Sequence, residues 1–248
     1  DRRALVLMAT GLGKSVVAYQ VISNEIRRNP NQEVLVLAHR TSLIRQLERA
    51  SWAQFSKHVS THLWTDGEHP TYSGGVVFAT YQSLVNHAND LAGRYGMVIV
   101  DEAHNAGAPE YQALLDRLQP NFMLALTATP WRGDHIGIDR IFGPPVFSMD
   151  IVEGMMKGFL AEVDYRLLTD PSTDWDEIKR LSQEGRSIKD LNRLLILPDR
   201  DVAMVDVVAG HFESTQSPKG IGFCRSIAHT EQLRGLFATR GIRTAVLH

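Results

Sequence analysis

The chain has 248 residues, 44% of them hydrophobic and 22% charged, and this composition excludes a disordered, collagen-like or low-complexity protein. There are 26 basic and 28 acidic residues, so any nucleic-acid site would have to be a local groove. The single cysteine, Cys224, excludes an intrachain disulfide and favours a reducing, cytoplasmic (or nucleoid-associated) location. Because no apolar run approaches the about 20 residues of a membrane helix and no secretory leader follows Asp1, we expect no membrane partner.

Short β-branched runs alternate with longer amphipathic stretches through residues 1–150. This alternation predicts an α/β fold with parallel strands joined by crossover helices. Apolar spacing at the helical period predicts two such helices, at residues 14–27 and 42–55. The expected strands, most of them continuously apolar as strands covered on both faces should be, are 4–8, 33–38, 61–64, 75–79, 97–101 and 122–126.

A break in regular structure is expected at residues 142–145, which contain Gly-Pro-Pro, so we place the end of the first domain near residue 150. Beyond it, the pattern predicts a helix that starts near Pro198 and carries one apolar stripe. The other elements expected there are a strand at 161–168, polar helices within 174–195, a helix at 226–239 and strands at 221–224 and 244–247. The predicted organisation is a domain at 1–150, a helical connector that begins a second domain at 151–218, and a truncated second domain at 219–248.

A phosphate-binding loop is expected where the first strand meets the first helix. Its residues are Thr10, Gly11, Gly13, Lys14 and Ser15. The two glycines permit positive φ and let backbone amides wrap phosphates, while Lys14 would place its ammonium between the terminal two phosphates. Ser15 would ligate Mg²⁺, and the helix that starts there adds its positive end. Met8 stands where the usual pattern has glycine, and a plain glycine turn before a buried helix is the alternative interpretation.

Two adjacent carboxylates, Asp101 and Glu102, follow the apolar strand at 97–101, at the strand end where ligands bind in open α/β sheets. Asp101 would hold Mg²⁺ through water, and Glu102 would orient or deprotonate the water that attacks the γ-phosphate. Two carboxylates this close are costly unless a cation lies between them, although a solvated strand end is the alternative. His104 lacks the HExxH spacing of a zinc site, so we expect no metal role for it.

Two hydroxyl residues, Thr127 and Thr129, follow the strand at 122–126. Their hydroxyls could bond the carboxylate or imidazole at the end of the previous strand, and such a link can report the nucleotide state to another surface. By itself a Thr-Ala-Thr sequence carries almost no functional information, because threonine commonly ends a strand.

Six segments of the chain together resemble motifs I, Ia, Ib, II, III and IV of superfamily 2 helicases. In order, they are ATGLGKS, LAHRTSL, ATYQSL, DEAH, LTATPWRGD and IGFCRSIAHTEQL. They are more similar to the branch with type I and III restriction motor subunits, RadD and XPB than to DEAD-box RNA helicases. The resemblance implies a RecA-like P-loop NTPase domain followed by the start of a second one. It also implies a helicase or translocase that uses ATP and Mg²⁺ on nucleic acid, DNA more than RNA.

The resemblance also implies residue roles. Nucleotide binding and catalysis would involve the glycine loop with Lys14, Asp101 and Glu102, while His104, Thr127 and Thr129 would couple hydrolysis to movement. Backbone contacts with nucleic acid, which need cations and hydroxyls rather than base-edge readout, would come from Arg40, Thr80, Arg225 and Ser226. A surface charge for Arg40 and a solvated helix cap for Arg225 are the alternatives, and Arg132 and Asp134 match the family pattern without a physical role.

Other functions remain as alternatives. A nucleotide-gated nucleic-acid scaffold without productive hydrolysis is one, although Glu102 counts against it, and an RNA helicase is another. A P-loop kinase or GTPase explains the glycine loop but not DEAH and Thr-Ala-Thr, and the sequence has no NKxD guanine signature. The later motifs of the family include arginine fingers worth about 10³ to 10⁵ in rate, so we expect these residues alone to bind nucleotide better than they hydrolyse it. Other subunits or appended nuclease or methyltransferase domains are further expected partners.

Overall fold

The computed structural model describes residues 2–65, 67–129, 137–163, 180 and 198–247. The chain separates into two compact units, residues 1–163 and residues 164–248, and each is described by itself. Within the described ranges, none of the helices combines the length and the apolar character needed to cross a lipid bilayer.

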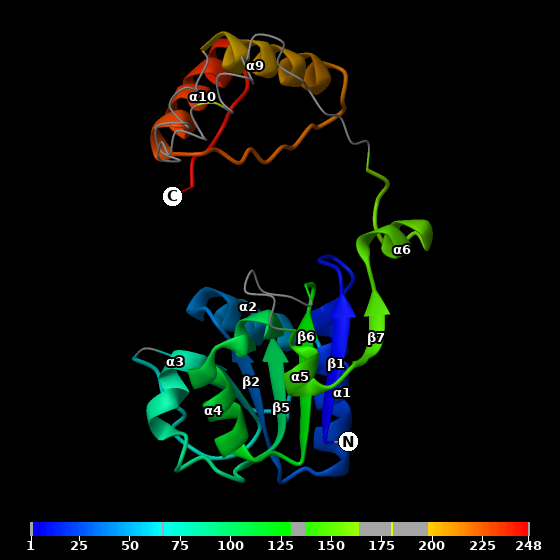
Figure 1. The fold of residues 1–248 in the computed structure, drawn as a ribbon, viewed down its shortest axis with the longest axis vertical. Helices are drawn as coiled ribbons and strands as arrows, with labels where there is room; N and C mark the ends of the chain where they lie inside the picture. Colours follow the sequence, from blue (N-terminus) through cyan, green and yellow to red (C-terminus); the bar gives the residue numbers. More distant parts are fainter. Residues whose placement is uncertain (1, 66, 130–136, 164–179, 181–197, 248) are drawn as a thin grey trace. The chain divides into compact units, whose positions relative to one another are not determined.

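The first unit is built on a seven-stranded sheet whose order is β3-β4-β2-β5-β6-β1-β7. Every neighbouring pair is parallel, so the strands end at the same edge of the sheet (Figure 1). The strands are β1 (Arg3–Met8), β2 (Glu33–Ala38), β3 (Thr61–Trp64), β4 (Val76–Thr80), β5 (Tyr95–Asp101), β6 (Phe122–Thr127) and β7 (Pro145–Met149). The predicted α/β class with a parallel sheet is confirmed.

Helices cover both faces of this sheet. The helices of this unit are α1 (Lys14–Arg28), α2 (Thr41–Ser51), α3 (Tyr81–Leu84), η1 (Val85–His87), η2 (Ala103–Gly107), α4 (Pro109–Leu118), α5 (Asp139–Phe142) and, after β7, α6 (Ile151–Met156). Residues of α1 and α2 share one buried cluster with the sheet, and residues of α3, α4 and α5 share another. Strands β2, β4 and β5 are therefore buried along their whole length, which explains the continuous apolar runs within them.

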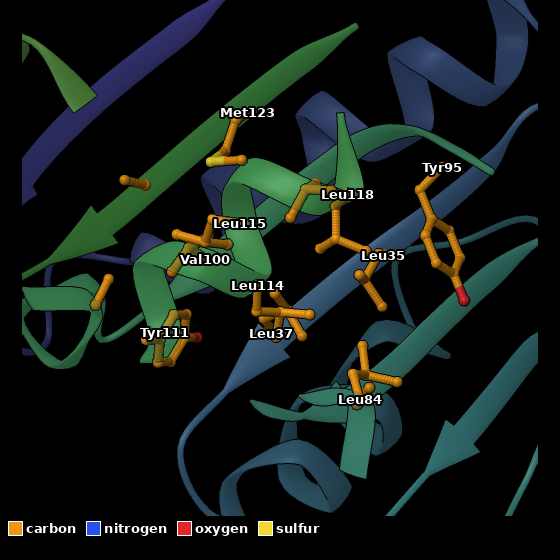
Figure 2. Close-up of a cluster of buried hydrophobic side chains, with 14 of the residues drawn as sticks. Leu35, Leu37, Leu84, Tyr95, Val100, Tyr111, Leu114, Leu115, Leu118 and Met123 are labelled. Carbon is orange, nitrogen blue, oxygen red and sulfur yellow. The ribbon is translucent and has the colours of Figure 1, made fainter. Parts of the chain in front are cut away.

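The core on the α4 side shows how helical spacing produces this packing. Leu114, Leu115 and Leu118 recur on one face of α4 and share a buried cluster with Leu35 and Val100 of the sheet (Figure 2). Burial of each leucine side chain stabilises the fold by about 1.5 to 3 kcal/mol. The core therefore holds the ends of the central strands in fixed relative positions.

The six strands expected in this unit are all present, with bounds that shift by up to two residues. The expected break at 142–145 is confirmed at Gly143 and Pro144 but was wrong at its two ends, because Phe142 is the last residue of α5 and Pro145 is the first residue of β7. Proline is tolerated at the start of an edge strand, where it removes no hydrogen bond that the sheet needs. The helix expected at 42–55 is α2, which ends earlier, at Ser51.

In the second unit, the described residues contain α9 (Pro198–Glu213) and α10 (Ile227–Thr239). Both helices were predicted. Val205 and Ala209 of α9 and Leu233 of α10 are buried, in agreement with the expected apolar stripe of α9.

The strands expected at 221–224 and 244–247 were wrong for the described structure, in which both segments lack regular structure. A strand is defined by its partners, and these two segments form no ladder with each other. Ile221, Phe223 and Leu247 are consequently exposed. Residues 161–163 also lack regular structure, and the rest of the strand expected at 161–168, like the helices within 174–195 apart from Arg180, lies outside the described residues.

Candidate nucleotide site

The expected phosphate loop and the expected acidic pair lie at the same edge of the sheet. Strand β1 ends at Met8 and β5 ends at Asp101, with β6 between them. Neighbouring strands are about 4.8 Å apart, so the two strand ends are separated by about 10 Å. The positive charge of Lys14 acts on Asp101 and opposes the rise in the pKa of that carboxyl. The lysine and the acid therefore belong to one site.

The loop between β1 and α1 has the backbone that phosphate binding requires. Gly11 and Gly13 both have a φ of 88°, which a residue with a side chain rarely adopts. Gly13 is the N-cap of α1, and no side chain caps this helix end. The first amides of α1 and the positive end of its dipole therefore offer a site for an anion.

Lys14 contacts Met8, the residue that stands where the usual phosphate-loop motif has glycine. Its Nζ donates a hydrogen bond to the carbonyl oxygen of Met8 at 3.1 Å. Met8 is the last residue of β1, its side chain is buried, and it pairs with Met149 of β7. Its φ is not positive, so glycine is not required at this position. The amide of Ala9 then donates to the carbonyl of Met149 at 3.0 Å, which ties the start of the loop to the edge strand.

Asp101 is the more buried of the two acids. Burial, followed by the adjacent charge of Glu102, raises its pKa to about 6, against the opposing effects of the Glu102 amide and of Lys14. An ionised carboxylate in this position is therefore short of positive charge. Glu102 is half-buried and has a left-handed backbone, with φ 49° and ψ 49°. A hard cation such as Mg²⁺ fits this oxygen-rich, charge-deficient position.

The expected link between neighbouring strand ends is present. Nδ1 of His104 lies 3.1 Å from Oγ1 of Thr127 and 3.3 Å from Oε2 of Glu102. The Thr127 hydroxyl donates to the carbonyl of Thr129 at 3.0 Å and accepts the amide of the same residue at 3.2 Å. The imidazole of His104 thus links the carboxylate of Glu102 to Thr127, and Thr127 in turn bonds Thr129.

One residue of this cluster was not predicted. The side-chain amide of Asn105 lies 3.2 Å from Nε2 of His104 and donates to the carbonyl of Glu102 at 3.2 Å. In the sequence, Asn105 is only a polar residue directly after DEAH, and this does not indicate a role. The turn of η2 places its side-chain amide beside the imidazole of His104.

The residues expected to contact nucleic acid lie in different settings. Arg40 is exposed and precedes α2. Thr80 is buried, and its hydroxyl caps α3 by accepting the amide of Ser83 at 3.4 Å. In the second unit, Arg225 is exposed and Ser226 caps α10 by accepting the amide of His229. Their contacts with nucleic acid stay predictions, and Arg132 and Asp134 lie outside the described residues.

A parallel sheet with a glycine loop after one strand, a carboxylate pair after another and an inserted strand between them defines a RecA-like P-loop domain of the helicase type. Residues 1–132, just over half of the chain, match the family described as the type III restriction enzyme, res subunit. The chain belongs to this family and is a superfamily 2 helicase of the restriction-motor type, as the motifs indicated.

Curated relatives agree with this assignment. The chain is 26% identical over 257 residues to the type I restriction enzyme EcoAI endonuclease subunit of Escherichia coli, an alignment that covers 94% of this chain and 31% of the relative. It is 24% identical over 192 residues to the DNA 3'-5' translocase XPB2 of Sulfurisphaera tokodaii, covering 77% of this chain and 41% of the relative. The chain thus spans less than half the length of either relative.

Solved structures share the fold. The type ISP restriction-modification enzyme LlaBIII, described as ATP-dependent and bound to DNA, matches with a TM-score of 0.63 at 16% identity, over 97% of this chain and 20% of that chain. The helicase domain of Hef from Pyrococcus furiosus matches with a TM-score of 0.56 at 16% identity, over 97% of this chain and 54% of that chain. At these identities the likeness concerns the fold alone.

Proposed function

We propose that the chain is the ATP-binding part of a DNA translocase or helicase motor that hydrolyses ATP with Mg²⁺. The observation that carries the proposal is the convergence of Lys14 and Asp101 at one sheet edge, where the charge of the lysine reaches the buried carboxyl. A magnesium triphosphate would neutralise both groups, because its phosphates carry negative charge towards the lysine and its metal ion carries positive charge towards the buried carboxyl.

The glycines, the lysine and the serine of the loop have separate parts in nucleotide binding. The amides around Gly11 and Gly13 and the ammonium of Lys14 would hold the phosphates, while Ser15 and Asp101 would hold the metal ion. Among the described residues no group of three or more His, Cys, Asp or Glu side chains converges to hold a metal. This fits Mg²⁺, which keeps several waters and binds through few protein ligands together with substrate phosphates. When bound, Mg²⁺ would neutralise charge that develops on the phosphates.

Glu102 is placed to act on the attacking water. Its carboxylate is partly exposed, next to the buried Asp101 and against the imidazole of His104. It would accept a hydrogen bond from the water, orient the oxygen towards the γ-phosphate and take its proton as the bond forms. The contact of His104 with Thr127 gives the site a mechanical link to β6, and through it hydrolysis would be coupled to movement.

DNA is the proposed substrate because relatives of the chain are a DNA translocase and a restriction endonuclease subunit. Arg40, Thr80, Arg225 and Ser226 would contact the nucleic-acid backbone. Other subunits, or nuclease and methyltransferase domains of a longer protein, would be its partners. We assign residues 1–150 to the first RecA-like domain, 151–218 to the connector and the start of the second domain, and 219–248 to the continuation of the second.

The test is single-turnover ATP hydrolysis by the chain, with and without DNA, because excess enzyme makes a slow rate measurable. Lys14→Ala should abolish nucleotide binding, and Glu102→Gln should abolish hydrolysis while binding persists. Lys57→Ala, at an exposed position away from the loop, is the matched control and should behave as wild type. Unchanged hydrolysis in both site variants would refute the proposal, and binding without hydrolysis in the wild type would favour the scaffold alternative.

A further inference from the structure

The side chain of Asn105 is held between the backbone of Glu102 and the ring of His104. Its Nδ2 donates to the carbonyl oxygen of Glu102 at 3.2 Å and lies 3.2 Å from Nε2 of His104. The backbone amide of Asn105 donates to the same carbonyl at 3.0 Å. Because the side-chain amide nitrogen carries two hydrogens, it can donate one to the Glu102 carbonyl and the other to Nε2 of His104.

This contact determines which ring nitrogen of His104 carries the hydrogen. The amide nitrogen of Asn105 can only donate, so Nε2 of the ring must accept. A neutral imidazole that accepts at Nε2 carries its hydrogen on Nδ1. Two donors would face each other across this contact if Nε2 were protonated.

The opposite side of the ring requires the same tautomer. The single hydrogen of the Thr127 hydroxyl is donated to the carbonyl of Thr129 at 3.0 Å. Oγ1 of Thr127 must therefore accept from Nδ1 of His104, 3.1 Å away. Asn105 and Thr127 thus select the Nδ1–H form independently, from opposite sides of the ring.

The nitrogen that carries this hydrogen, Nδ1 of His104, also lies 3.3 Å from Oε2 of the Glu102 carboxylate. Glu102 also has the left-handed backbone that residues with side chains rarely adopt, and such a conformation persists only where neighbours hold it. Asn105 contributes to both constraints, because it bonds the carbonyl of Glu102 twice and sets the tautomer of the ring that meets its carboxylate.

We propose that Asn105 is a positioning residue that holds His104 in the Nδ1–H tautomer and so orients the carboxylate of Glu102 towards the attacking water. This inference rests on the proposed function for its effect on hydrolysis, whereas its effect on the imidazole does not depend on that function.

The first test observes the tautomer directly. Long-range ¹⁵N–¹H spectra of the 248-residue chain distinguish a protonated from an unprotonated ring nitrogen, and comparison with His104→Gln assigns the signal among the 10 histidines. Wild type should show hydrogen on Nδ1 alone. Asn105→Asp, which keeps the shape but replaces the donor by an acceptor, should place a hydrogen on Nε2. An unprotonated Nε2 in this variant, or a protonated Nε2 in the wild type, would overturn the proposal.

The second test separates positioning from binding. Asn105→Leu should lower the single-turnover rate of ATP hydrolysis at least about tenfold, because a misplaced base loses part of its contribution, while the Kd for magnesium ATP changes less than about twofold. Asn24→Leu, at an exposed position of α1, is the matched control and should leave both quantities unchanged. An equal loss of binding and rate in Asn105→Leu would indicate a merely structural role and refute positioning.

The two proposals fail in different ways. If Lys14→Ala abolishes hydrolysis while Asn105→Leu does not change it, the role of Asn105 is refuted and the motor assignment stands. If Lys14→Ala has no effect on hydrolysis, the motor assignment is refuted, and the spectra alone decide whether Asn105 sets the tautomer.

Discussion

The side chain of Leu12, in the middle of the phosphate loop, lies against Gly154 of α6. A Cβ on Gly154 would lie 2.8 Å from Cδ2 of Leu12 and 3.0 Å from Cδ1 of Leu160. Leu160 also meets the loop itself, because its Cδ2 lies 3.0 Å from the position of a Cβ on Gly11. The loop therefore rests on the segment that follows β7, and its shape depends on a position without a side chain.

Gly154→Val should raise the Kd for magnesium ATP about tenfold. A valine at this position displaces Leu12 and Leu160, and overpacking of this kind costs about 1 to 3 kcal/mol. Gly235→Val in α10, where a Cβ meets no atom within 4 Å, is the control and should bind nucleotide as wild type does. Titration with a fluorescent ATP analogue measures both constants. Wild-type affinity in Gly154→Val would show that the loop does not depend on α6.

Asp101→Asn should stabilise the nucleotide-free chain while it removes Mg²⁺-dependent nucleotide binding. The pKa of Asp101 rises from 3.8 to about 6 in the folded state, mainly through burial. Between these values the folded state holds a proton that the unfolded state has lost, so stability falls as the pH rises through this window and stays lower above it. This rise of about two pKa units corresponds to about 3 kcal/mol, which is the largest increase in the free energy of unfolding that Asp101→Asn can give at pH 7.

Thermal unfolding of the nucleotide-free protein at several pH values checks this prediction. The variant should have the higher Tm at pH 7, and the difference should shrink towards pH 4, where wild-type Asp101 is itself becoming neutral. Asp90→Asn, at an exposed position, is the control for the loss of one carboxylate and should change the Tm at pH 7 less than Asp101→Asn does. A variant less stable than wild type at pH 7 would mean that a nearby cation already compensates the buried charge.

The sequence predicted the strands of the sheet and the main residues of the site, but not every contact between those residues. Unbroken apolar runs such as 97–100 indicate central strands reliably, because a strand that is buried on both faces cannot carry polar side chains on either of them. The glycine loop and the acids could be placed at one edge because parallel strands end on the same side. The sequence indicated that the hydroxyls of Thr127 and Thr129 could bond either the carboxylate or the imidazole at the previous strand's end, and the structure brings Thr127 within hydrogen-bond distance of His104.

Features that depend on three-dimensional neighbours were not predictable. Pro145 indicates a break by its residue type, yet it starts a strand because β1 offers an edge. The segment at 221–224 has a strand-like sequence but no partner among the described residues. Asn105 acquires its contacts only through the turn of η2, and the packing of Leu12 on Gly154 joins positions far apart in the chain.

Far from the nucleotide site, at the start of β2, Glu33 forms a buried ion pair that makes stability depend on pH. Its carboxylate accepts hydrogen bonds from the guanidinium of Arg94, one of them at 3.1 Å, and from the amide of Gly74. Burial raises the pKa of Glu33, but the bonds from Arg94 and Gly74, with the charges of Arg94 and His62, outweigh it and lower the pKa below 4.5. The ionised form therefore stabilises the fold above its ordinary pKa, and this contribution is lost as the pH falls through the lowered value.

Glu33→Gln should lower the free energy of unfolding by about 1 to 3 kcal/mol at pH 7, because it leaves a partly buried guanidinium without its charge partner. The deficit should shrink as the pH falls below 4.5, because the carboxyl of the unfolded state takes up a proton before that of the folded state does. Asp116→Asn is the control, since its pair with Arg3 is largely exposed and should contribute less than about 1 kcal/mol. Urea unfolding at pH 7 and at low pH measures both variants. If Glu33→Gln lowers the free energy of unfolding equally at every pH, the loss comes from packing, and the ion pair with Arg94 does not stabilise the fold.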